Sequence, residues 1–371
     1  MVTGPRGASG ERILARIKAL VEAESHSGDP DGLRRAFDLL TPMVVEASGR
    51  VPGRAAAGGV PYLHLPAERD PSVLLLCHLD TVWPRGSLRK NPFSVTGDRA
   101  TGPGIFDMKA GLALGLEAMS LAAGADHAAL LVTGDEELGS GTSRAIIEAV
   151  ASRSRAVLVL EGAAAGGALK SARKGVATYD FEIVGRASHA GLEPEAGINA
   201  TAELAALISD VLAMADRDAG TSVTPTLASA GTTGNTVPDR GQLHVDVRAW
   251  TLAELERVDG AARSRAPAVP GAAIAVRGGI NRPPMEAKVS AALLDLARRA
   301  ARETGLGEIG AAAVGGGSDG NLTSALGIPT IDGLGAVGGG AHADDEWISV
   351  AALAPRARLI ARLIDLVVAA S

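Results

Sequence analysis

Acidic and imidazole side chains follow three apolar runs of this 371-residue chain, at the point where each run ends. His78 and Asp80 come after the first run. The triplet 135–137 (Asp-Glu-Glu) comes after the second run, and Glu161 follows the third. In open α/β sheets the functional crevice lies outside the carboxyl ends of the strands. Imidazole nitrogens and carboxylate oxygens gathered there are typical of a site for a borderline-hard metal ion.

Two further candidates lie in glycine-rich loops. Asp107 follows Gly-Pro-Gly at the start of a predicted helix, and His342 lies in Gly-Gly-Gly-Ala-His-Ala-Asp-Asp-Glu. Each group alone has a simpler explanation: a structural histidine, a solvated turn for Glu136-Glu137, or a helix N-cap for Asp107. Asp135 also fits a turn. Together, however, so many like charges at strand ends would be costly without a cation to neutralise them.

The remaining histidines and the single cysteine show no comparable pattern. Cys77 is the only cysteine, which excludes an internal disulfide framework and fits a reducing cytoplasm. It precedes His78 in a predicted strand, so its side chain should point to the opposite face, into the core. A structural role is the expectation for four histidines, namely His26, His64, His127 and His244.

The apolar runs themselves predict strands that are covered on both faces of a sheet, because they do not alternate with polar residues. Helical stretches separate these runs, and this alternation favours an α/β layer with mostly parallel strands. Strands are predicted at 73–77, 129–132 and 156–160, and helices at 11–23, 34–46, 109–123 and 142–151. Pro42 is expected to kink or end the second helix.

The pattern changes near residue 173. Tyr179, Phe181 and Ile183 alternate with Asp180 and Glu182, which predicts a strand with one wet face. The following segment predicts strands at 178–184, 223–229, 241–249 and 272–277, and helices at 199–213 and 252–265.

Asn281 to Pro284 reads as a linker, and the α/β pattern then resumes with a helix at 287–303, a strand at 329–331 and a final helix. We therefore expect a two-domain α/β protein. Residues 1–173 and 285–371 would form a domain with a mixed, mostly parallel sheet, and 174–284 an inserted α+β domain.

Length and composition agree with a two-domain α/β protein and argue against other classes of protein. A chain of 371 residues exceeds what one core usually spans, so about two domains are expected. The net charge of −6 and the lack of a basic stripe argue against nucleic acid. The N-terminus lacks the apolar core of a signal peptide. The apolar stretch 350–370 carries four charged residues, which favours a surface helix packed on a core over a membrane span: Arg356, Arg358, Arg362 and Asp365.

Ordered motifs of the chain resemble those of the M20 metallopeptidases. The resemblance covers nearly the whole chain, and the motifs are specific in combination. They are His78-Leu79-Asp80-Thr81-Val82, the stretch Gly102-Pro103-Gly104-Ile105-Phe106-Asp107-Met108-Lys109-Ala110-Gly111, Asp135-Glu136-Glu137-Leu138-Gly139-Ser140, Glu161-Gly162 and His342. The stretch 93–107 is similar to the carboxypeptidase G2-like branch, which often has a second Asp where this chain has Met108.

The resemblance implies two cations per subunit, zinc first, with cobalt or manganese compatible with the same ligands. His78, Asp107 and Glu161 would hold one cation. Asp107 would bridge to the second, which Glu137 and His342 complete. Asp80 would accept a hydrogen bond from the far nitrogen of His78. Glu136 would be the general base that removes a proton from a water whose pKa the metals lower towards about 7.

The resemblance also implies substrate contacts from the inserted domain, which would have a ferredoxin-like fold and act as a lid and dimerisation domain. His189, in Ser188-His189-Ala190-Gly191, would support the oxyanion, often in the partner subunit. Asn235 would supply a lid amide, and Arg248 would grip a carboxylate through two hydrogen bonds. The loop with Gly316, Gly317 and Ser318 would lie beside the substrate. The simpler readings are a surface-loop histidine, a turn residue, a solvated strand charge and a flexible connector.

The activity implied is hydrolysis of the amide bond of N-acyl amino acids or short peptides with a free carboxylate. The branch favours glutamate as a product, and a homodimer through the inserted domain is expected. A biosynthetic N-acetyl or N-succinyl amino-acid deacylase is the second enzyme reading. A non-catalytic binding protein on the same fold is the alternative of another class. A P-loop or a nicotinamide site is disfavoured, because neither glycine-rich signature is present.

Overall fold

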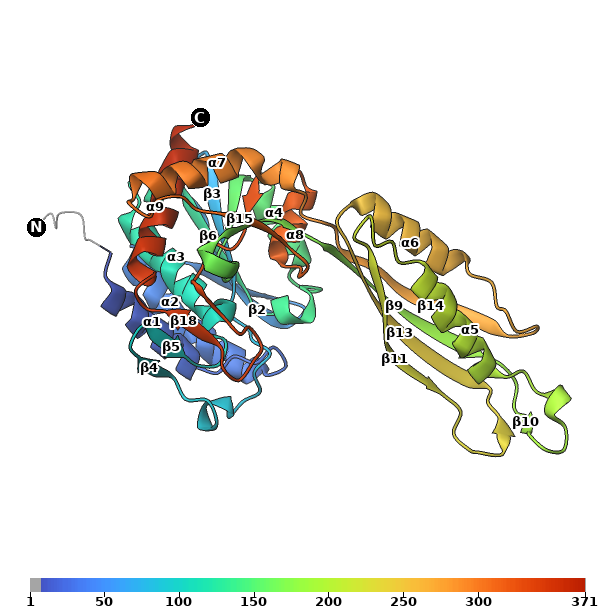
Figure 1. Ribbon diagram of the computed structural model, residues 1–371. Helices are drawn as coiled ribbons and strands as arrows, with labels where there is room; N and C mark the ends of the chain where they lie inside the picture. Colours follow the sequence, from blue (N-terminus) through green and yellow to red (C-terminus); the bar gives the residue numbers. More distant parts are fainter. Residues whose placement is uncertain (1–7, 371) are drawn as a thin grey trace, which may run out of the picture. The chain divides into compact units, whose positions relative to one another are not determined.

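The computed structural model describes residues 8–370, so the first part of the N-terminal stretch assessed for a signal peptide lies outside the described residues. Contacts divide the chain into two compact units. The first unit extends to Ala172 and also contains Glu286–Val314 and the chain from Ser318 onward. The second unit contains Arg173–Met285 and Gly315–Gly317. Figure 1 shows both units, coloured along the sequence.

A six-stranded sheet forms the centre of the first unit, in the order β1-β2-β6-β3-β7-β16. Strands β3, β6, β7 and β16 are parallel, whereas β1 and β2 are antiparallel, which confirms a mixed, mostly parallel sheet. His78 pairs with Thr133 across β3 and β6, so these strands end side by side. The bounds are β1 Gly53–Ala57, β2 Val60–Leu65, β3 Ser72–His78, β6 Ala128–Thr133, β7 Ser154–Val159 and β16 Thr330–Ile331.

Helices cover both faces of this sheet (Figure 1). Val73, Leu75 and Cys77 of β3 pack into one core with α1, α2, α3, α7 and α9. Leu74 and Leu76 face the other core, with α4 and α8. Cys77 is buried, which confirms its predicted core position. The bounds are α1 Gly10–Glu22, α2 Pro30–Ser48, α3 Ala110–Leu121, α4 Arg144–Ala151, α7 Ala287–Glu303, α8 Asp319–Ala325 and α9 Leu353–Ala369.

Two local predictions differ from the structure. Pro42 was expected to kink or end its helix; it does not end α2, which continues to Ser48 and stops at Gly49 in the left-handed region. Val44 and Ala47 beyond the proline are buried, so packing against the core stabilises the helix past Pro42. The predicted linker is also shorter than expected, because Asn281 and Arg282 belong to strand β14 (Ala273–Arg282).

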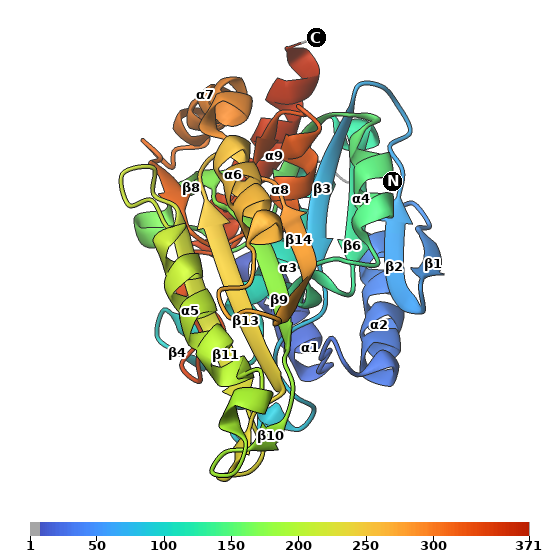
Figure 2. The ribbon, with the colours of Figure 1, turned by 90° about the vertical axis from the view of Figure 1, so that its right-hand side faces the viewer.

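The second unit has a four-stranded antiparallel sheet in the order β11-β13-β9-β14. Helices α5 and α6 cover one face (Figure 2), and with this strand order they form the expected ferredoxin-like arrangement. Tyr179, Phe181 and Ile183 are buried while Asp180 is exposed, which confirms the predicted wet face. The bounds are β9 Gly175–Val184, α5 Ala200–Ala213, β11 Ser222–Ala230, β13 Arg240–Ala249 and α6 Leu252–Ser264.

The described residues also contain short strands and helical turns that hydrophobic periodicity did not predict. One small sheet joins β17 (Gly338–Gly339), β18 (Trp347–Ser349), β5 (Arg99–Thr101) and β4 (Ser94–Thr96). Two-stranded ladders join β15 (Ala311–Val314) to β8 (Leu169–Arg173), and β10 (Ser188–His189) to β12 (Thr236–Val237). The short helical turns are η1 Ser87–Arg89, η2 Ile105–Lys109, η3 Ala125–His127, η4 Glu136–Leu138, η5 Ala165–Gly167 and η6 Pro194–Ala196. Among residues 8–370, none of the helices is long and apolar enough to span a membrane.

Candidate metal centre

The carboxyl ends of three neighbouring strands place the first group of predicted site residues. His78 is the last residue of β3 and is 1% exposed. Glu136 and Glu137 form the turn η4 that follows β6, and Glu161 follows β7. Because β3 is paired in parallel with both β6 and β7, these side chains reach the same edge of the sheet.

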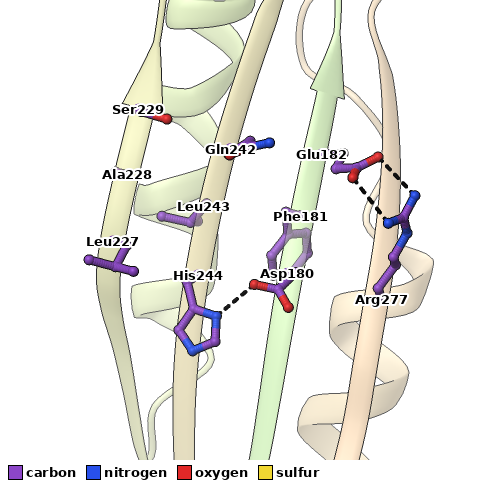
Figure 3. Close-up of a pocket in the computed structure, with 10 residues that line it drawn as sticks. All are labelled: Asp180, Phe181, Glu182, Leu227, Ala228, Ser229, Gln242, Leu243, His244 and Arg277. Carbon is purple, nitrogen blue, oxygen red and sulfur yellow. Dashed lines mark hydrogen bonds and ion pairs between the residues drawn. The ribbon is translucent and has the colours of Figure 1, made fainter.

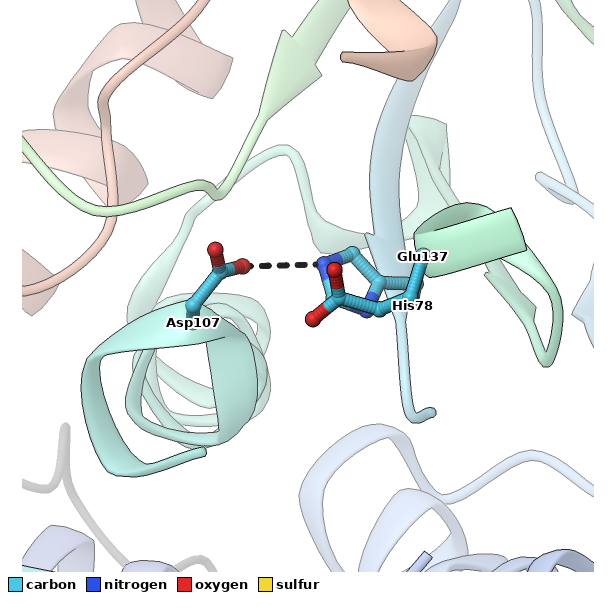
Figure 4. Close-up of side chains that lie close together, drawn as sticks. All are labelled: His78, Asp107 and Glu137. Atoms are coloured by element: carbon cyan, nitrogen blue, oxygen red, sulfur yellow. Dashed lines mark hydrogen bonds and ion pairs between the residues drawn. The ribbon is translucent and has the colours of Figure 1, made fainter. Parts of the chain in front are cut away.

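His78 lies between two carboxylates. Its Nε2 is 3.1 Å from Oδ1 of Asp107 and 3.4 Å from Oε1 of Glu161. Its Nδ1 donates to the main-chain oxygen of Asp80 at 3.0 Å, in the tautomer that leaves Nε2 free for a ligand. Figure 4 shows His78 with Asp107 and Glu137, which approach it from separate segments of the chain.

His342 completes the cluster from the far end of the chain. Its Nε2 lies 3.4 Å from Oδ2 of Asp107 and 3.2 Å from Oε2 of Glu137. The two oxygens of Asp107 therefore face two different imidazoles. The backbone of His342 has φ +64°, a conformation that L residues adopt rarely outside turns and functional sites.

Asp80 contacts His78 differently from the expectation. The far nitrogen of His78 is bonded to the Asp80 carbonyl, and the carboxylate Oδ1 lies further away, at 3.4 Å. The carboxylate instead accepts hydrogen bonds from the main-chain N–H of Glu136 at 3.2 Å and of Glu137 at 3.1 Å. Asp80 thus orients the His78 ring and the turn η4 together.

Glu136 lies within reach of the same cluster. Potential ligand atoms of His78, Glu136 and Glu161 all lie within 4.8 Å of one another, as do those of His78, Asp107 and Glu137. Asp135 points elsewhere, because its Oδ2 accepts from the main-chain N–H groups of Thr142 and Ser143. This confirms the turn role that was the simpler reading of Asp135.

The carboxylates shift the pKa values of both histidines upward. Hydrogen bonds with Asp107 and Glu137 raise the pKa of His342 to about 10. Burial alone would lower the pKa of His78, but Asp107, Asp80 and Glu161 raise it well above its ordinary value. Although burial opposes it, the two histidines hold the pKa of Asp107 well below its usual range. The cluster therefore attracts positive charge strongly.

The donor set fits metal ions. Ligands about 2.0–2.1 Å from a tetrahedral cation lie about 3.4 Å from one another. The nitrogen–oxygen separations here, between 3.1 and 3.4 Å, match that spacing. Oε1 of Glu137 is buried without a hydrogen-bond partner among the described residues, and a cation would satisfy it.

One buried carboxylate beside this centre was not singled out from the sequence. Glu346 accepts hydrogen bonds from the loop that carries Asp107 and is 2% exposed. Its only local signal is the acidic triplet after His342, where Asp344 and Asp345 are exposed. Nothing in that triplet distinguishes the buried member, because its partners lie far away along the chain.

The predicted lid residues belong to the second unit. His189 and Asn235 are neighbours there, because β10 pairs with β12 and the Ala190 N–H donates to the main-chain oxygen of Asn235 at 2.9 Å. Nδ1 of His189 accepts from the N–H of Gly191 and Leu192, and the side chain is exposed.

Arg248, on β13, already has a carboxylate partner. Its Nε and Nη2 donate to the two oxygens of Asp246, both at 2.8 Å. A substrate carboxylate would have to compete with this two-bond pair.

The predicted substrate loop is also bonded internally. The carbonyls of Gly316 and Gly317 accept from Arg173 at 2.9 and 3.3 Å. Ser318 is buried and caps α8, since its Oγ accepts from Gly320 and donates to Asp332. Its N–H donates to the side chain of Asn321. Both polar groups of Ser318 are therefore committed to the helix cap.

A pocket of about 530 Å³ lies on the wet face of the sheet in the second unit (Figure 3). Its charged side chains are paired with one another: His244 with Asp180, and Arg277 with Glu182. None of the predicted catalytic, metal-binding or substrate-binding residues lines it. We assign this pocket no part in the chemistry.

The chain is similar to known peptidases along most of its length. Residues 74–366 match peptidase family M20/M25/M40. Carboxypeptidase G2 of Pseudomonas sp. (strain RS-16) is 32% identical over 370 residues, which cover 95% of this chain and 88% of that protein.

Solved structures share the fold, among them two from Bacillus species. Aminopeptidase PepT from Bacillus cereus ATCC 10987 has a TM-score of 0.77 at 22% identity, covering 97% of this chain and 99% of that chain. Bacillus subtilis YxeP, a dinuclear metal-binding peptidase from the M20 family, has a TM-score of 0.66 at 16% identity, covering 97% and 98%.

Proposed function

Because the chain belongs to peptidase family M20/M25/M40 and is thus a hydrolase of amide bonds, we propose that it uses two metal ions to cleave N-acyl amino acids or short peptides that carry a free C-terminal carboxylate. The observation that supports this most is the position of Asp107. Its two oxygens face His78 and His342 separately, and each histidine has a carboxylate of its own. One bridging carboxylate between two such pairs suits two adjacent cations.

His78, Asp107 and Glu161 would hold one ion, and Asp107, Glu137 and His342 the other. The mixture of imidazole and carboxylate suits zinc, and cobalt or manganese fit the same ligands. Such ions act as Lewis acids, which lower the pKa of water and stabilise negative charge on a carbonyl oxygen.

Glu136 would act as the general base. It is half-buried, and its ligand-capable atom lies within 4.8 Å of those of His78 and Glu161. The carboxylate would take a proton from the attacking water and later deliver it to the leaving amine. Asp80 supports both groups, because it contacts the His78 ring and the N–H of Glu136.

The substrate side of the proposal rests on resemblance in sequence. Residues 174–284 would act as the inserted lid, with His189 supporting the oxyanion, Asn235 contacting the substrate amide and Arg248 binding the carboxylate. Gly316, Gly317 and Ser318 would line the substrate loop. The identity to carboxypeptidase G2 favours glutamate as the released amino acid. A homodimer through the inserted domain, located in the cytoplasm, completes the proposal.

A hydrolysis screen with metal-reconstituted protein tests the activity, read by release of free amine. Folyl- and peptidyl-glutamates are compared with N-acetyl and N-succinyl amino acids. We expect faster turnover of the glutamates. Preference for the acetyl or succinyl substrates would instead support the biosynthetic deacylase.

The variant Glu136→Gln tests the role of the general base. It should keep the bound metal and lose about 10²–10⁴-fold in kcat, since it removes only the proton acceptor. Unchanged turnover in this variant would reject the role of Glu136. If the wild-type protein binds metal and cleaves none of the substrates, the non-catalytic reading gains support.

A further inference from the structure

The loop that carries His342 is tied to the loop that carries Asp107 by one side chain, Glu346. Its two oxygens accept four hydrogen bonds. Oε1 receives the main-chain N–H groups of Phe106 at 2.8 Å and Asp107 at 2.9 Å. Oε2 receives the N–H of Gly104 and the indole N–H of Trp83, both at 2.9 Å.

All four partners of Glu346 are N–H donors, and the two oxygens of a carboxylate can accept from all of them at once. A protonated carboxyl group would present an O–H to one of the N–H groups, and a glutamine would present its NH₂ to two of them. Glu346 is 2% exposed, so water cannot replace a lost partner.

Glu346 also contacts the backbone of Asp107, the proposed bridging ligand. One of the four donors is the Asp107 N–H, so its backbone cannot move without breaking a bond to Glu346. Glu346 also follows His342 closely, and turns bonded through the N–H groups of Ala343 and Glu346 connect them. A single carboxylate thus joins the segment of the bridging ligand to that of the second histidine.

We propose that Glu346 is a positioning residue that sets the separation of Asp107 and His342 and thereby the geometry of the two-cation site. It contacts none of the proposed ligand atoms and acts through the main-chain N–H groups of the Gly104–Asp107 loop and the indole N–H of Trp83. This inference rests on the proposed two-metal function, and its test separates the failure of one from the failure of the other.

A purely structural buried carboxylate is the alternative, and Glu117 provides the comparison. Glu117 is fully buried in α3 of the same unit, where it pairs with Arg12 and Arg16 and accepts the Ser9 N–H. Glu346→Gln and Glu117→Gln should both lower the melting temperature. Only Glu346→Gln should change how metal binds.

The experiment titrates Co²⁺ into metal-free wild-type protein and the two variants, and follows visible absorption and bound metal after dialysis. We expect Glu346→Gln to bind at least one Co²⁺ about 10–100-fold more weakly and to show an altered spectrum, as is usual when support of a ligand is lost. Glu117→Gln should match the wild type in both readouts.

Wild-type affinity and spectrum in Glu346→Gln would overturn the inference. If Glu346→Gln does not fold, Glu346→Asp, which keeps the charge but is one methylene shorter, replaces it with the same expected direction and the same contradicting result. A wild-type protein that fails to bind two Co²⁺ ions would instead reject the proposed function.

Discussion

Asp107 differs from the other carboxylates of the centre in facing both histidines. Of the two histidines, Glu161 approaches His78 through Oε1, and Glu137 forms an ion pair with His342 through Oε2. Removing Glu161 or Glu137 would therefore leave one histidine with its carboxylates, whereas removing Asp107 would affect both. This asymmetry is what the proposed two-cation centre requires, and two unrelated ion pairs would not show it.

We expect Asp107→Ala to lose both metal ions and Glu161→Gln to lose mainly one, because only Asp107 contributes an oxygen to each histidine. Metal content per chain after dialysis, measured by mass spectrometry, checks this. Asp344→Ala is the control, since that exposed carboxylate pairs with Lys90 near His342 and should leave metal content unchanged. Two ions retained in Asp107→Ala would contradict the bridging role.

Metal binding should release protons and strengthen as pH rises. The pKa of His342 is about 10 in the metal-free protein, so its imidazole is protonated at neutral pH and must lose that proton to bind a cation. The apparent affinity should therefore increase with pH until this pKa is passed. Calorimetric titrations in buffers of different ionisation enthalpy measure the protons released. Binding without proton release at neutral pH would be evidence against His342 as a ligand.

At the scale of elements, α3 packs closely against the chain that follows β7, directly before Glu161. A Cβ added at Gly111 of α3 would be 1.8 Å from the carbonyl oxygen of Leu160, the residue before Glu161. Glycine is needed here because no side-chain movement can relieve a clash with backbone. The helix that begins after Asp107 thus also contacts the strand end that carries another predicted ligand.

Gly111→Ala should therefore destabilise the protein by about 1–3 kcal/mol, the usual cost of overpacking. Gly260→Ala is the matched control: Gly260 is exposed in α6, its added Cβ would meet nothing within 4 Å, and alanine should stabilise that helix by about 0.5–1 kcal/mol. Urea unfolding measures both. Equal stability of the two variants would show that α3 and β7 can separate easily.

At the scale of the whole molecule, the expected homodimer has a candidate surface in the second unit. β11 is an edge strand of its sheet, paired only with β13, and Leu227 on it is 71% exposed. Unpaired edges with exposed apolar side chains are favourable sites for association. These features support the dimerisation that the resemblance implies.

Sedimentation of the full chain should give twice the mass of 37.4 kDa, and Leu227→Asp should shift the equilibrium toward monomer. The reason is that a buried, unpaired charge disfavours the interface. Leu252→Asp, on an exposed leucine at the start of α6, is the control and should leave the mass unchanged. A monomeric wild-type protein at micromolar concentration would reject the dimer.

Much of the fold could be predicted because it depends on neighbours in the sequence. The unbroken apolar run of β3 indicates burial on both faces, and the alternation of apolar and polar residues along β9 indicates burial on one face. Strands of two or three residues, such as β10 with His189, contain too few positions for a pattern. Pro42 shows the limit of local rules, since core contacts beyond it outweigh the preference of proline.

By itself, the sequence determined the order of the motifs, the types of the charged groups and their place at the ends of predicted strands. Only the tertiary structure decided which atoms meet: that the two oxygens of Asp107 face separate histidines, that Arg248 is paired with Asp246, and that Glu346 holds the Asp107 loop. The physical reason is distance along the chain. Glu346 and Phe106 are 240 positions apart, and such a contact depends on how whole layers pack rather than on the residues beside it.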